Sequence, residues 1–122
     1  MATSTLIVLR TMKSLLNIPE KTAPRTIERV VIAEFGFGPK LVAIIWNMLV
    51  ERNLVPENCV VRNLLWFYAY VKSYATYELY CTKFRTTKPT FMLKVGLLST
   101  AIAAMKDEVV SNKLFIYFFK LI

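Results

Sequence analysis

The stretch TYELYCTKFRTTKPTFMLKV, residues 76–95, contains one whole predicted helix and the start of the next. Its first half repeats apolar residues three or four positions apart, which is typical of an amphipathic helix. These residues are Tyr77, Tyr80, Cys81 and Phe84. The pattern breaks at residues 85–87 and resumes at Lys88, which is followed by a proline suited to the first turn of a helix. We therefore predict a helix over about 76–84, a three-residue turn, and a longer helix over about 88–110, in the order of a helix-turn-helix.

The same stretch contains four cations, Lys83, Arg85, Lys88 and Lys94, and no acidic residue occurs between Glu78 and Asp107 to offset them. The backbone N–H groups that begin a helix can bind phosphate, and threonines and cations beside them strengthen such a site. Thr87 is also suited to capping the second helix. We predict that DNA contacts come from Lys83, Arg85, Thr87, Lys88, Thr90 and Lys94. Base readout would come from side chains near Lys88, Thr90, Phe91 and Lys94.

A second interpretation of these cations stays open, in which they form a solvated rim on a helical bundle. Residues 91–93 (Phe-Met-Leu) are more apolar than a helix that enters a DNA groove should be. Nearby aromatic residues are interpreted as core packing rather than as a platform for stacked bases. These are Trp66, Phe67, Tyr68, Tyr70 and Tyr74.

The rest of the chain is also predicted to be helical, with helices over about 3–17, 24–35, 39–53 and 59–73. Thr22 is a candidate cap for the second helix, and Gly96 suggests close packing or a bend in the last one. The fourth helix is apolar nearly all round and should lie at the centre. The predicted fold is all-α, a small bundle of five to six helices containing a helix-turn-helix-like unit. Its core should include Ile45, Trp46, Leu64, Leu65, Trp66 and Phe84.

Three regions are expected along the chain. Residues 1–23 form an N-terminal helix and connector, 24–111 form the helical domain with the helix-turn-helix-like segment at about 76–105, and 112–122 form an apolar tail. The first 18 residues lack acids and overlap in composition with an organelle transit segment. We interpret them as an ordinary first helix.

The composition limits the kinds of partner. Hydrophobic residues make up 56% of 122, so either the helices are largely buried or apolar surface is left for a protein partner or a missing catalytic domain. The uncharged apolar runs are about half the roughly 20 residues that a spanning helix needs, and no integral membrane insertion is expected. The net charge of +8 favours acidic partners, which include nucleic acid, an anionic membrane and an acidic protein surface.

The chain contains few residues of the types that act in catalysis. The chain has no histidine, eight acids of which one is aspartate, and no phosphate-binding glycine motif. Its cysteines, Cys59 and Cys81, are interpreted as buried free thiols of an intracellular protein. We expect no catalytic residues, no metal site, no cofactor and no enzymatic activity.

Four short patterns together resemble the helical region that precedes the catalytic domain in Harbinger-type transposase-derived proteins. The patterns are Phe35-Gly36-Pro39-Trp46, Arg62-Leu64-Leu65-Trp66, Thr76-Glu78 and Thr87-Thr90-Phe91, and the similarity covers about residues 35–110. The segment Met92–Val95 departs from the basic residues and tryptophan that relatives tend to carry there. In that family the chemistry depends on three metal-binding acids in a later RNase H-like domain, which this sequence does not contain. The resemblance therefore implies a helical, DNA-associating region without the family's activity.

The expected function is that of a non-catalytic, DNA-associating fragment of a Harbinger-like transposase, located in the nucleus. One alternative is a small helical module for protein–protein interaction in the cytoplasm. Another is a membrane-surface or organelle protein that uses its first helix and its basic face.

Overall fold

The computed structural model describes residues 2–108, and within them the chain forms six α-helices and no strand. The helices are α1 (Thr5–Leu16), α2 (Pro24–Phe35), α3 (Pro39–Glu51), α4 (Val61–Ser73), α5 (Tyr77–Phe84) and α6 (Lys88–Glu108). The prediction of a small all-α protein is confirmed. The predicted tail, residues 112–122, and the last two residues predicted for the sixth helix lie outside the described residues.

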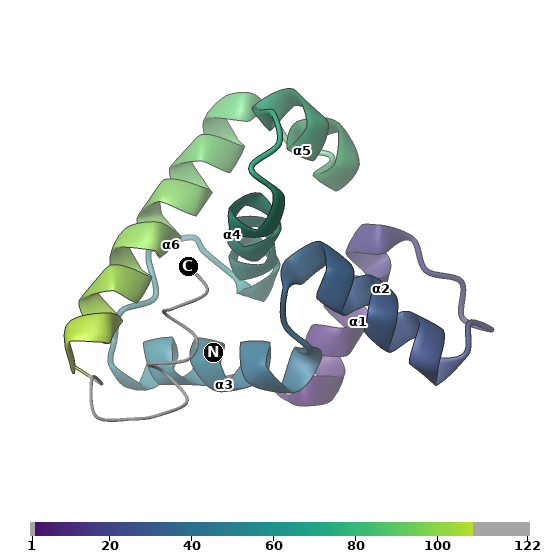
Figure 1. The fold of residues 1–122 in the computed structure, drawn as a ribbon. Coiled ribbons are helices and arrows are strands. Elements are labelled where there is room, and N and C mark those ends of the chain that lie inside the picture. The colour runs from purple at the N-terminus through teal and green to yellow at the C-terminus, as the bar shows by residue number, and fades with distance from the viewer. Residues whose placement is uncertain (1, 109–122) are drawn as a thin grey trace.

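Helix α4 is the centre of the molecule. In Figure 1 it runs through the middle, with α6 along one side and α1 and α2 on the other. Its residues 63–69 are all buried, as expected for a helix that is apolar nearly all round. Asn63 is polar, and its side-chain Oδ1 accepts a hydrogen bond of 2.9 Å from the backbone N–H of Val60 at the start of the helix.

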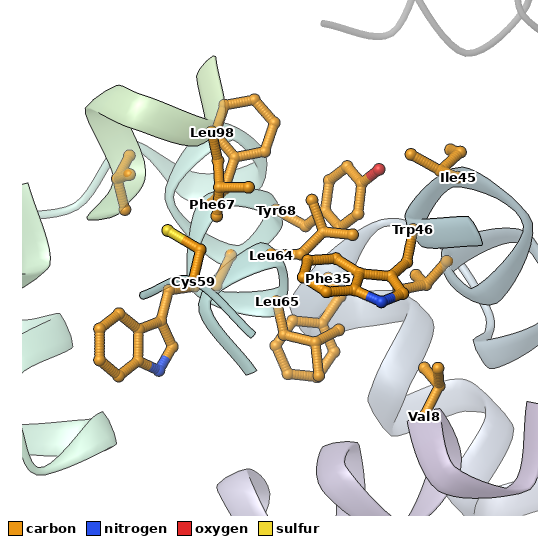
Figure 2. Packing of buried hydrophobic residues seen from close by; sticks show 14 of the residues in the cluster. Val8, Phe35, Ile45, Trp46, Cys59, Leu64, Leu65, Phe67, Tyr68 and Leu98 are labelled. Atoms are coloured by element: carbon orange, nitrogen blue, oxygen red, sulfur yellow. The ribbon is translucent and has the colours of Figure 1, made fainter. Parts of the chain in front are cut away.

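The core joins all six helices. Figure 2 shows Leu64, Leu65 and Tyr68 of α4 near Trp46 and Ile45 of α3. The predicted core set is confirmed, because each of its members is buried in one cluster: Ile45, Trp46, Leu64, Leu65, Trp66 and Phe84. Burial of side chains of this size contributes about 1.5–3 kcal/mol each.

Helix α1 shares this core. It packs mainly on α3 and also contacts α4, and it buries Val8, Met12 and Leu15. The backbone of Thr3 and the side-chain amide of Asn47 exchange two hydrogen bonds, of 2.8 and 2.9 Å, which tie the start of the chain to α3.

One local prediction is wrong, and so is the close-packing alternative for Gly96, whereas a bend there stays a prediction. The N-cap of α2 is Ala23 rather than Thr22, and no side chain caps the helix. Pro24 at its start has no N–H to satisfy, which lessens the need for a cap. Gly96 does not mark close packing, because a Cβ added there would meet no atom within 4 Å. Both thiols are free, Cys59 buried and Cys81 half-buried.

Candidate nucleic-acid interface

The turn between α5 and α6 begins with an arginine in a left-handed conformation. Thr76 caps the start of α5 by accepting a hydrogen bond of 3.3 Å from the N–H of Leu79. At the other end Arg85 has φ 55° and ψ 52°, and its N–H donates to the carbonyl of Cys81. Glycine usually occupies such a position, because a Cβ is disfavoured at positive φ. The left-handed residue lets the chain leave α5 and start α6 within three residues.

The start of α6 is capped by threonine, as predicted. The Oγ1 of Thr87 accepts a hydrogen bond of 3.4 Å from the N–H of Thr90, and its hydroxyl donates to that of Thr90 at 2.9 Å. Both side chains are exposed and lie at the helix start. These two threonines therefore stabilise the helix start at the surface where an anion would approach.

Aromatic side chains of α4, α5 and α6 pack against one another next to the turn. The ring of Trp66 is stacked on Phe84, with centroids 6.4 Å apart, and is 5.8 Å from Phe91. Tyr80 is stacked on Phe91 at 5.3 Å. Its hydroxyl accepts a hydrogen bond of 2.9 Å from the N–H of Ala75 and also bonds the hydroxyl of Ser73. This packing holds α5 against α4 and α6, so the two helices that flank the exposed turn are fixed relative to each other.

The four predicted cations differ in their surroundings. Lys83 forms an ion pair with Glu34 of α2, and the Nζ of Lys94 donates to the carbonyl oxygen of Asn58. Lys88 lies 3.8 Å from Glu78, with both side chains well exposed, so this ion pair is weak. Arg85 is exposed. Arg85 and Lys88 are therefore the members of the set best placed to meet a phosphate.

The contacts of Lys83 and Lys94 carried no signal in the sequence. Their partners are 49 and 36 residues away along the chain. The first contact needs α2 packed beside α5, and the second needs the loop before α4 packed beside α6. Only the tertiary arrangement brings these groups together.

Beyond its first turn, α6 exposes an apolar surface. Met92 is 45% exposed, Leu93 60% and Leu97 39%. Apolar side chains make no hydrogen bonds to the edges of bases in the major groove. Within α6, the features predicted for a DNA-binding helix are therefore clearest in its first turn.

The aromatic residues near the interface divide into two groups. Trp66, Phe67 and Tyr68 are buried, which confirms their interpretation as core. Tyr70 is half-buried, whereas Tyr74, at the C-terminal end of α4, is 66% exposed. The interpretation of Tyr74 as core packing is wrong, because this residue follows the last residue of α4 and its side chain is exposed.

Two further properties concern the described residues alone. No group of three or more cysteine, aspartate or glutamate side chains there is placed to hold a metal ion. No single helix there is long and apolar enough to cross a membrane, although α2 and α3 together, bent by 49°, meet the length and composition criteria.

Comparison with known proteins gives no match to a family model, to a curated protein or to a solved structure.

Proposed function

We propose that this chain is a non-catalytic, DNA-associating helical protein that contacts the phosphate backbone through the turn between α5 and α6. The observation that carries the proposal is the placement of two exposed cations, Arg85 in the turn and Lys88 at the first residue of α6. Cations at a helix start are well suited to phosphate.

The charge of the chain supports the same proposal. With 16 basic and eight acidic residues, its net charge is +8, and this attracts a polyanion over distances of about a Debye length. A protein with these properties would act in the nucleus. The four patterns that resemble Harbinger-type transposase-derived proteins lie within α2–α6 or the turns between them, and we propose that this region is derived from such a protein.

A second candidate is a module for protein–protein interaction, and it is favoured by the apolar surface of α6. Met92, Leu93 and Leu97 lie on one helix and are exposed together. Apolar surface of this kind fits a protein partner or a catalytic domain supplied by another chain. This candidate predicts that DNA binding depends on net charge alone.

The test is a salt series of duplex binding with a matched control for charge. One variant carries Arg85→Gln and Lys88→Gln. The control carries Lys21→Gln and Arg29→Gln, which remove two exposed cations from the connector and α2. If Arg85 and Lys88 contact phosphates, the slope of log affinity against log salt should fall by about 2 in the first variant.

The control should leave that slope close to that of the unmodified chain. Equal losses in the two variants would mean that net charge holds the DNA, which would overturn the proposed interface and favour the second candidate. Circular dichroism of each variant verifies that the helices remain intact.

A further inference from the structure

A groove of about 340 Å³ lies between α6 and the junction of α4 with α5, next to the proposed interface. Three tyrosines, Tyr70, Tyr74 and Tyr77, line it from α4, from the residue after α4, and from α5. Met92, Gly96 and Ser99 line it from α6. None of its lining residues is charged, so the groove offers ring faces, apolar groups and neutral hydroxyls.

The tyrosines form one connected set. The rings of Tyr70 and Tyr77 are stacked, with centroids 5.5 Å apart and planes within 10°. Tyr74 meets Tyr70 edge-on at 5.6 Å. Each of the three rings therefore has an aromatic neighbour, and Tyr74 is the one that remains mostly open to solvent.

Tyr74 is an unusual residue for its position. Its backbone is left-handed, with φ 51° and ψ 37°, where glycine or asparagine is favoured. A bulky residue is disfavoured in this conformation. Its side chain gains little from burial in return, because it is 66% exposed. The fold does not require a tyrosine at this point, so its ring is available for a contact outside the chain.

A cation lies at the edge of the groove. The Nζ of Lys88 is 5.9 Å from the centre of the Tyr77 ring, and Lys88 is one of the proposed phosphate contacts. A ligand that uses both features needs a flat, uncharged ring joined to an anion. An unpaired nucleotide has this chemistry, since its base can stack on an aromatic side chain while its phosphate meets the cation.

We propose that the groove binds an unpaired nucleotide of a single strand, with the base against Tyr74 and the phosphate on Lys88. This inference rests on the proposed function and adds to it a preference for unpaired bases. It accounts for one member of the apolar surface of α6, because the exposed Met92 lines the groove.

The experiment compares two single strands of equal charge by fluorescence anisotropy. One is an oligothymidylate of about 12 nucleotides, and the other has the same phosphates with abasic sites in place of the bases. The unmodified chain should bind the first about tenfold more tightly, which corresponds to one base stacked on an aromatic ring. Tyr74→Leu should lose most of this preference.

Gly96 provides a second variant that should leave the fold intact. Gly96→Leu would place its side chain in open space at the groove, and leucine has a higher helix propensity than glycine. It should abolish the preference for bases. The matched control is Ala103→Leu, an exposed position two turns further along α6 that does not line the groove, and it should retain the preference.

Each outcome supports or overturns the nucleotide site or the proposed function. Equal binding of both strands by the unmodified chain would overturn the nucleotide site, while a duplex slope that depends on Arg85 and Lys88 would leave the proposed function standing. Full preference in Gly96→Leu would overturn the groove as its location. No binding of single strands or duplex would overturn both proposals.

Discussion

Tyr68 is enclosed by the core, with 2% of its surface exposed. Burial raises the pKa of its hydroxyl well above the ordinary value of 10.0, because a phenolate is poorly solvated inside the protein. In the unfolded chain the group ionises near its ordinary pKa, so above that pH the unfolded state binds fewer protons than the folded one. The free energy of unfolding should therefore be unaffected by this group at neutral pH and should fall as pH rises above about 10.

Urea unfolding across a pH series measures this effect. Tyr68→Phe should show a weaker alkaline decline than the unmodified chain, and Tyr74→Phe, at an exposed position, is the matched control. An identical decline in Tyr68→Phe would contradict the prediction. Burial also raises the pKa of the Cys59 thiol, an effect that nearby Lys94 partly offsets, so some alkaline decline should remain in every variant that keeps this cysteine.

At the scale of the element, substitutions of Thr87 at the start of α6 distinguish a role in helix stability from a role in DNA binding. The hydroxyl of Thr87 caps the helix through the N–H of Thr90. Thr87→Ala should lower the free energy of unfolding by about 1 kcal/mol, whereas Thr87→Ser should keep it nearly unchanged. Thermal unfolding followed by circular dichroism measures the difference. A stable alanine variant with weakened duplex binding would mean that the hydroxyl serves DNA rather than the helix.

Most helix positions could be predicted because their signals are local. Pro24 and Pro39 occupy first turns, and Gly36 ends α2 at positive φ. The failures have a different cause. Tyr74 and Arg85 are left-handed without being glycine, and what lies opposite Gly96 depends on neighbouring helices. Likewise, the tyrosine groove needs three elements brought together, so no local pattern in the sequence could reveal it.

At the scale of the whole molecule, α1 is part of one cooperative core. Val8, Met12 and Leu15 are buried, and side chains of this size contribute about 1.5–3 kcal/mol each, or roughly 5–9 kcal/mol together. A domain of this kind has a net stability of about 5–15 kcal/mol. The contribution of α1 is therefore comparable to the stability of the whole protein, and losing its contacts should unfold α3 and α4 as well.

Two aspartate substitutions in the full chain test this dependence. Met12→Asp places a carboxylate at a position with no exposed surface, whereas Ile7→Asp places one on the same helix at a position that is 50% exposed. Burial of an unpaired charge is far more costly than its exposure. The first variant should therefore lose the cooperative thermal transition. Circular dichroism measured during heating tests this. The second should keep a transition close to that of the unmodified chain. If both variants unfold at the same temperature as that chain, the core is stable without α1, and α2–α6 form the cooperative unit by themselves.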